Sequence, residues 1–429
     1  MMPLEFAFWF SAACVLYTYV LYPLLLWTLA RVCPRPIRVG SLPIGSVSVV
    51  LAAYNEESRI RARIGELVKL VAARPAGGEV IVVSDGSTDR TVAEAQTAAF
   101  EAASEACGSV QVRVLVQEPW LGKAKALNLA HGAARHPILV FADARQTWAP
   151  DAIERITENF ADTSVGAVSG DLVVESAPGV MAGVGLYWRF EKWLRRTESR
   201  FDSMVSVTGC IAAVRRELFP TLPPGTILDD VYWPLAVAMR GHRVIHEGRA
   251  RAFDRLPEKT SDEFRRKVRT LAGNFQLMAR LPAALMPWRN RLWWQFVSHR
   301  ALRLVVPWAM LVLLCASAVL AGPIYRCTFW GQVAFLTIGL AGANNAIARR
   351  SRLASAIYSF LVLNAAAWVA FWVWAGGRSS RSWARVTYQA PSSPAAPGES
   401  EISQSRPILR VEPIGASGRG SRRKGEAGD

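Results

Sequence analysis

Cysteine and histidine are scarce in this sequence, which has six cysteines and five histidines in 429 residues. No cysteines form a C-x-x-C pair or a ligand cluster, so neither a disulfide framework nor a cysteine-based zinc site is expected. His242 and His246 are four residues apart in a segment expected to be an extended strand, which would not bring them together as a metal pair, and the other histidines stand alone. We therefore expect all five to be structural. A hydrophobic fraction of 51% excludes a disordered or collagen-like chain.

What the sequence has in excess is positive charge and apolar residues, and the two are separated. The formal net charge is +16, and the mean hydropathy is nevertheless positive, at +0.18. Four runs without a charged residue explain this combination: 6–30, 304–325, 327–348 and 353–377. Each run is long enough to cross a hydrocarbon core of about 30 Å as a helix. We therefore expect a transmembrane anchor at 1–32 and three transmembrane helices within 304–377.

The flanking charges predict how the chain is oriented. No basic segment precedes the first run and no A-x-A-like site follows it, which favours a retained anchor over a cleaved signal peptide. Arg31, Arg35 and Arg38 follow this run, so the positive-inside rule places the domain after it on the cytoplasmic face of the inner (plasma) membrane. Four spans would leave the basic and disordered tail expected at 378–429 outside, so either one run does not cross or the tail is exported.

The segment before the second apolar run mixes basic and aromatic residues. Basic side chains there are interleaved with Trp288, Trp293, Trp294 and Phe296. Such mixing can indicate nucleic-acid binding, but directly before a membrane span it favours a helix lying on anionic lipid. We expect an interfacial amphipathic helix at 286–303 and no nucleic-acid partner.

Between the apolar runs, residues 33–285 have the pattern of an α/β domain. Short β-branched runs at 46–53, 79–84, 110–117 and 137–142 alternate with helical patterns that begin near residues 58, 88 and 122. This alternation predicts a mostly parallel sheet that binds ligands beyond the carboxyl ends of its strands. The acidic residues at those ends are Glu56, Asp85 and Asp143. Asp85 or Asp143 alone could serve a turn or cap a helix, but three strand ends together favour a site.

Several segments, in order, resemble the membrane-bound glycosyltransferase family 2, which includes polysaccharide synthases and lipid glucosyltransferases. The matching segments lie within 46–276 and are SVVLAAYNEES, IVVSDGSTDRT, LGKAKALNLA, VFADA, LDDVYWPLAVAMRGHRV and RRKVRTLAGNFQ. The resemblance implies a GT-A type nucleotide-sugar-binding domain, in agreement with the predicted sheet.

The resemblance also implies how the donor is held. The residues expected to bind the uridine of a UDP-sugar are Ala53, Tyr54, Asn55, Glu56 and Asp85. Lys123, at a helix start, would meet the diphosphate, although a surface lysine is the alternative. Asp143 occupies the first position of the family's D-x-D metal motif, and Arg145 replaces the second aspartate. Either Asp143, the diphosphate and water hold Mg²⁺ or Mn²⁺, or Arg145 takes over part of the metal's charge neutralisation.

For catalysis, the resemblance to the family's T-E-D motif places the general base at Asp230, supported by Asp229, in a reaction that inverts the anomeric centre. Alternatively, the two acids are present only because negative side chains stabilise the N-terminus of a helix. Arg266 and Arg269 correspond to the Q-x-x-R-W stretch that closes over the pyrophosphate, and only Arg269 matches its identity. The family would line its acceptor pocket with Asp171, Gly209 and Cys210.

The expected function is therefore an inverting hexosyltransferase that moves a sugar from a UDP-sugar to a polysaccharide acceptor. A lipid glycosyltransferase that adds a single sugar is the first alternative, because the last three apolar runs offer few polar residues to line a polymer channel. The main ones are Thr337, Asn344, Asn345, Ser355, Ser359 and Asn364. The second alternative is a catalytically degenerate nucleotide-sugar-binding subunit, which the unusual Arg145 would suggest.

Overall fold

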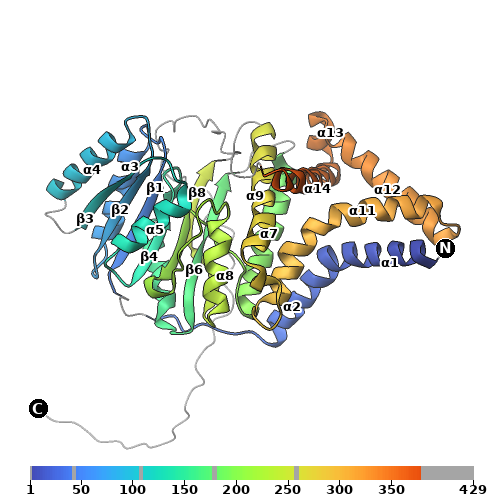
Figure 1. The fold of residues 1–429 in the computed structure, drawn as a ribbon, viewed down its shortest axis with the longest axis horizontal. Helices are drawn as coiled ribbons and strands as arrows, with labels where there is room; N and C mark the ends of the chain where they lie inside the picture. The colour runs from blue at the N-terminus through green and yellow to red at the C-terminus, as the bar shows by residue number, and fades with distance from the viewer. Residues whose placement is uncertain (1, 41–44, 106–109, 176–180, 256–259, 378–429) are drawn as a thin grey trace, which may run out of the picture. The chain divides into compact units, whose positions relative to one another are not determined.

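The computed structural model describes residues 2–40, 45–105, 110–175, 181–255 and 260–377, so the predicted tail lies outside the described residues. One eight-stranded sheet, ordered β3-β2-β1-β4-β7-β6-β8-β5, organises the domain (Figure 1). The strands are β1 Val47–Ala53, β2 Gly78–Asp85, β3 Val110–Gln117, β4 Ile138–Ala142, β5 Thr147–Trp148, β6 Val165–Glu175, β7 Ile211–Arg215 and β8 Arg243–Arg255.

The four predicted strands are confirmed, and they form the parallel block β3-β2-β1-β4. β7 pairs antiparallel with β4 and with β6, while β6 and β8 are parallel. The mostly parallel α/β sheet is thus as predicted. Because β1, β2 and β4 run in one direction, Ala53, Asp85 and Ala142 end at the same edge.

Helices cover both faces of this sheet (Figure 1). The helices of the domain are α3 Ile60–Ala72, α4 Thr91–Glu105, α5 Lys123–Ala133, α6 Ala152–Thr157, α7 Met181–Phe201, α8 Asp229–Met239 and α9 Thr260–Arg280. One buried cluster joins the sheet to α3, α4 and α6, and a second joins its other face to α5 and α8. In α3 the buried Ile60, Ile64, Leu67 and Val71 follow helical spacing, which explains why this segment is a helix against the sheet.

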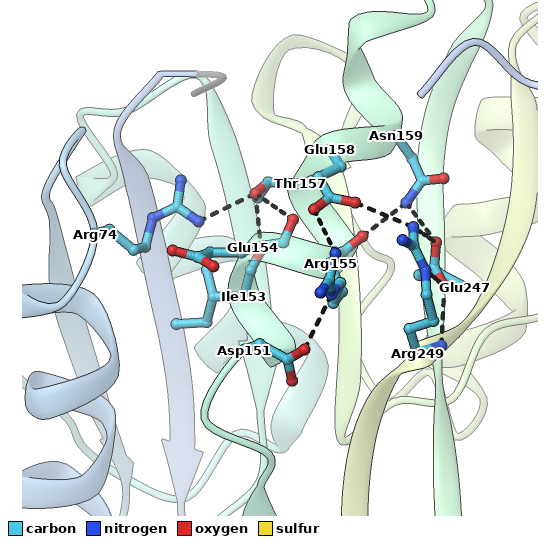
Figure 2. Close-up of polar contacts among 10 residues, drawn as sticks. All are labelled: Arg74, Asp151, Ile153, Glu154, Arg155, Thr157, Glu158, Asn159, Glu247 and Arg249. Atoms are coloured by element: carbon cyan, nitrogen blue, oxygen red, sulfur yellow. Dashed lines mark hydrogen bonds and ion pairs between the residues drawn. The ribbon is translucent and has the colours of Figure 1, made fainter. Parts of the chain in front are cut away.

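A polar network holds an irregular part of β8 (Figure 2). The register of β8 against β6 shifts between His246 and Arg251. There the Arg249 guanidinium donates to Glu247 at 2.8 Å and to Glu158, next to α6, at 3.0 Å. Beyond this bulge β8 continues alongside β5 and carries Asp254 toward the site.

Three helices are long and apolar enough to cross a membrane: Met2–Val32, Trp293–Val319 and Arg352–Ala375. The first comprises α1 Met2–Leu16, a π-helical turn Tyr17–Leu21 and α2 Tyr22–Val32; the others contain α11 Leu302–Val319 and α14 Arg352–Ala375. The predicted run 327–348 differs. α12 Pro323–Ala341 and α13 Asn345–Arg350 divide it, and α12 carries Arg326 and Gln332. Within the described residues, two candidate spans therefore follow the domain, where we predicted three.

The region predicted as an interfacial helix at 286–303 also differs. α10 Trp293–Phe296 and the π-helical turn Val297–Ala301 run without a break into α11, so the charged end of the region is the base of a candidate span. His299 is buried there between Glu191 and Glu198 of α7, at 2.8 and 2.7 Å. Arg303 also pairs with Glu191, at 2.7 Å. Pairing with a buried glutamate, rather than contact with lipid, accounts for the charge of Arg303.

Candidate active site

A lysine and two carboxylates meet at the carboxyl edge of the sheet. Lys123 begins α5, Asp143 follows β4 and Asp229 begins α8. The Lys123 Nζ lies 2.9 Å from Asp143 Oδ1 and 3.9 Å from Asp229 Oδ2. Burial lowers the pKa of Lys123, but the carboxylates of Asp143 and Asp229 more than reverse this and hold the pKa above its usual value. Lys123 is therefore a constant positive charge inside the site.

Asp230 lies beside this cluster and has the properties of a base. Burial raises its pKa to about 6, and the neighbouring Asp229 adds to the shift, while the guanidinium of Arg300 opposes it. The Val207 N–H donates to the Asp230 backbone carbonyl at 2.9 Å. A Cβ built on Gly209 would lie 3.9 Å from Asp230 Oδ2, so a glycine leaves one side of the carboxylate open. At neutral pH this carboxylate is mostly ionised and still basic enough to accept a proton.

The residues after β1 and β2 are bound to one another. Asn55 adopts a positive φ of 55°, and its side-chain oxygen accepts from the Thr88 N–H at 2.7 Å. The Asn55 N–H donates to Ser87 Oγ at 3.1 Å. The Glu56 N–H donates to Thr91 Oγ1 at 2.7 Å. These hydrogen bonds join the segment after β1 to the segment after β2, so the predicted nucleotide-binding residues at the two strand ends are held together.

Asp85 shapes that surface through the turn after β3. Its Oδ1 accepts from Gln117 Nε2 at 2.6 Å and from the Leu121 N–H at 2.8 Å. A Cβ on Gly86, whose φ is +62°, would come within 2.4 Å of the Trp120 nitrogen, so only glycine permits this approach. The rings of Trp120 and Tyr54, both partly exposed, then lie 6.4 Å apart between centroids. Two aromatic side chains thus border the place predicted for the nucleobase of the donor.

Arg145 lies apart from the lysine and carboxylate cluster. Its guanidinium pairs with Asp254 Oδ2 of β8 at 2.5 Å, and Gln146 Nε2 donates to the same oxygen at 2.9 Å. The carboxylate of Asp143 is paired with Lys123. Whether Arg145 takes over part of the charge neutralisation of a metal stays a prediction.

Of the predicted acceptor residues, Asp171 is held by Lys192 and Arg196 of α7, each at 3.1 Å. Cys210 is buried, and burial raises the pKa of its thiol. Its carbonyl accepts from Trp148 Nε1 at 3.0 Å. The burial of Cys210 and the raised pKa of its thiol indicate a structural residue and not a reactive nucleophile.

α9 brings the predicted basic residues toward the cluster. The guanidinium of Arg269 is close enough to oppose the rise that burial causes in the Asp229 pKa. Lys267 Nζ lies 5.2 Å from the ring centroids of Tyr187 and Trp188 on α7. Arg266 is one turn before Thr270, whose hydroxyl donates to the Arg266 carbonyl at 3.0 Å.

α9 also holds the loop that leads into Asp229. The Gln276 side chain accepts from the Ile227 N–H and donates to the Gly225 carbonyl, both at 3.0 Å. A Cβ on Gly273 would meet Leu228 Cγ at 2.7 Å, so the helix lies directly against this loop. Phe275, next to Gln276, stacks on Trp374 of α14 with ring centroids 5.6 Å apart. Gln276 is therefore a positioning residue for the two aspartates.

We expect Gln276→Leu to lower kcat by about 10- to 100-fold with a smaller change in the donor KM, because the loop before Asp229 loses two hydrogen bonds and the two aspartates after it move. Gln276→Glu keeps the acceptor for the Ile227 N–H and should recover part of kcat. Gln111→Leu, on the exposed edge of β3, is the matched control. Equal kcat in Gln276→Leu and the control would show that the loop does not depend on Gln276.

Sequence reasoning missed Trp120, Gln276, Arg195 and Arg300. Trp120 follows a strand at the same edge, so the rule applied to the other strand ends would have found it. The positive charges of Arg195, on α7, and Arg300, at the start of a candidate span, lower the pKa of the Asp230 carboxyl. No local pattern relates these two arginines to Asp230.

A divalent metal would find few protein ligands here. Among the described residues, no group of three or more His, Cys, Asp or Glu side chains is placed to hold a metal ion. The Asp143 side chain is 35% exposed and offers hard oxygen atoms of the kind Mg²⁺ and Mn²⁺ prefer. The donor set therefore fits an ion shared with a bound diphosphate and not an all-protein site.

Comparison with known proteins agrees with this geometry. Residues 48–222 match the family model described as glycosyl transferase family 2. Over these residues the chain is a glycosyltransferase family 2 domain. The resemblance inferred from the motifs is thus confirmed. The matched region contains β2, β3, β4 and all of β1 except Val47, together with Lys123 and Asp143, while Asp229 and Asp230 lie shortly beyond its end at residue 222.

Among solved structures, the mannosyltransferase PcManGT from Pyrobaculum calidifontis, in complex with GDP-Man and Mn²⁺, aligns with a TM-score of 0.62 and 24% identity over 86% of this chain and 99% of that one. This family 2 chain therefore has the predicted GT-A fold.

Two curated relatives align with only part of this chain and with only part of their own length. The poly-β-1,6-N-acetyl-D-glucosamine synthase of Staphylococcus aureus (strain COL) is 24% identical over 248 residues, which are 54% of this chain and 56% of that protein. The dolichyl-phosphate β-glucosyltransferase of Drosophila melanogaster is 38% identical over 107 residues, 24% of this chain and 31% of that protein. The chain thus spans about half or less of the length of these two relatives.

Proposed function

We propose that this family 2 glycosyltransferase is an inverting hexosyltransferase that uses a nucleoside-diphosphate sugar, with a UDP-sugar as the first candidate donor. The observation that carries the proposal is the position of Asp230, a carboxyl with a pKa of about 6 beside the cluster of Lys123, Asp143 and Asp229. A base and a group of diphosphate-binding charges side by side are what a single displacement at an anomeric carbon needs.

In the proposed reaction, the Asp230 carboxylate accepts the proton of the acceptor hydroxyl. The acceptor oxygen forms a bond to the anomeric carbon, and the bond from that carbon to the β-phosphate oxygen breaks, with inversion. The nucleoside diphosphate leaves with the electron pair of the broken bond. Lys123, always charged, and Arg269 are the side chains placed to meet its growing negative charge. A divalent ion bound at Asp143 would supply further neutralisation of the diphosphate.

The acceptor we propose first is a polysaccharide, in keeping with the likeness to the poly-N-acetylglucosamine synthase. A lipid that receives one sugar is the second candidate, and one observation favours it. Asn344, a residue considered for a channel lining, caps α13 by accepting from the Ala346 N–H at 2.9 Å and lies between candidate spans. The polar lining available to an extruded polymer is correspondingly smaller.

We further propose that the catalytic domain is cytoplasmic, because Arg31, Arg35 and Arg38 follow the first candidate span. Three crossings would return the chain to the cytoplasmic side at residue 378, which suits the positive charge of the tail. The basic stretch at 349–352 would then lie on the opposite side, against the same rule.

Nucleotide release from the detergent-solubilised full chain tests this function. We expect turnover with at least one member of a UDP-sugar panel, and a product that partitions as polymer or as lipid. GDP-mannose belongs in the panel, because PcManGT was solved with it. Release with GDP-mannose alone would overturn the UDP assignment. Binding of nucleotide without release from any donor would identify a degenerate binding subunit.

A further inference from the structure

A cavity outside the active site has three arginines among its lining residues. It has a volume of about 260 Å³ and is lined by Arg35, Pro36, Ile37, Arg196, Ser199, Arg200 and His246. None of these lining residues is acidic. A concave space with three guanidinium groups and no carboxylate on its wall suits an anion, and above all a phosphate, which accepts paired N–H donors.

The arginines that line the cavity still have N–H donors exposed to a ligand. Arg35 pairs with Asp202 and Arg196 with Asp171, yet their side chains remain 60% and 53% exposed. Arg200 is exposed and makes no side-chain ion pair with the described residues. His246 Nε2 accepts from Arg196 Nε at 3.2 Å, which leaves its Nδ1 as the protonated nitrogen of a neutral ring.

The cavity is at the end of a basic stripe on α7. Arg189, Trp193, Arg196 and Arg200 follow one another at steps of four, three and four residues and are all exposed. On another side of the helix, Glu191, Leu194 and Glu198 are buried. Tryptophan side chains are enriched at the membrane–water interface and arginines are attracted to anionic lipid headgroups, so the exposed row suits the headgroup layer.

The cavity also lies where the chain leaves the first candidate span. That span ends at Val32, and three residues later the Arg35 N–H donates to the Arg200 carbonyl at 2.9 Å. Three extended residues cover at most about 10 Å. The headgroup layer on each side of the hydrocarbon core is roughly 5–8 Å thick. Arg35 and Arg200 are thus within reach of lipid phosphates.

We propose that this cavity, with the α7 stripe beside it, binds the phosphate-bearing headgroup of an anionic membrane lipid. This site goes beyond the transfer reaction and does not depend on which sugar or acceptor the enzyme uses. Bound lipid would join the end of the first span to α7, the helix whose other side carries Glu191 and Glu198 against the base of the second span.

Lipid retention by the full chain in nanodiscs tests the proposal. We expect wild-type protein, extracted from nanodiscs of phosphatidylcholine with about one fifth phosphatidylglycerol, to retain phosphatidylglycerol in native mass spectrometry. Arg200→Gln should weaken this retention about fivefold and Arg196→Gln/Arg200→Gln about 25-fold, since each arginine near an anionic surface contributes about 1 kcal/mol. Arg135→Gln, an exposed arginine at the far end of β4, should behave as wild type.

Nanodiscs of phosphatidylcholine alone show whether the variants fold, because the melting temperatures there should equal that of wild type. Equal retention of the two lipids by wild type, or equal retention by wild type and the double variant, would overturn the proposal. Displacement of the lipid by millimolar inorganic phosphate would assign the cavity to a soluble phosphate and also overturn the lipid assignment.

Discussion

Asp230→Asn is expected to reduce kcat at pH 8 by about 10³-fold while leaving donor binding within a few fold of wild type. The amide has nearly the same shape as the carboxylate but cannot accept the proton of the acceptor hydroxyl, and positioned bases contribute 10²- to 10⁴-fold. The measurement is nucleotide release under saturating donor, beside a binding titration. Asp151→Asn, an exposed acid paired with Arg155, is the matched control.

The pH profile distinguishes a base from a residue that only shapes the site. Because burial raises the Asp230 pKa to about 6, kcat/KM of the wild type should be level above pH 7 and should fall tenfold per pH unit below about 6. The residual activity of Asp230→Asn should lack this acidic limb. Retention of the limb in the variant would mean that another group titrates and that Asp230 is not the base.

Asp143→Asn is expected to lower turnover by about 10²-fold or more and to abolish the response to Mn²⁺. The variant loses an exposed oxygen ligand for a divalent ion and leaves Lys123 as the nearby cation, and stabilising the charge of a leaving diphosphate contributes several kcal/mol. The measurement is nucleotide release across a Mn²⁺ titration after treatment with a chelator.

Asp162→Asn is the matched control, because Asp162 lies in an exposed turn where it accepts from Ser164. A wild type that is fully active in chelator, or an Asp143→Asn variant with an unchanged Mn²⁺ response, would contradict a metal role for Asp143. In either case Lys123 and Arg269 would be left to neutralise the diphosphate.

Much of the fold follows from patterns that are local in the chain. The run ILVFA is apolar at every position and VSVVLAA at every position except Ser48, a pattern typical of a strand covered on both faces. Asp85 and Asp143 could be placed at one edge from sequence alone, because parallel strands end on the same side. In the helix at Asp229–Met239, the buried Val231, Leu235 and Ala238 recur at helical spacing, which is also a local pattern.

Such local patterns do not predict which charged side chains pair with each other. Arg145 is two residues from Asp143 in the chain, yet its partner is Asp254, 109 residues away. The basic residues before the second span were expected to face lipid, and Arg303 instead pairs with Glu191 of α7. A long side chain pairs with whatever opposite charge the fold brings within about 4 Å, and burial makes leaving it unpaired costly.

For this glycosyltransferase, the sequence by itself determined the strands, the edge at which they end and the acidic residues placed there, since period and strand direction are properties of the backbone. Only the tertiary structure decided that Lys123 pairs with Asp143, that Gln276 holds the loop before Asp229 and that Arg300 acts on Asp230. These relations depend on distances through space between segments far apart in the chain, which no local period encodes.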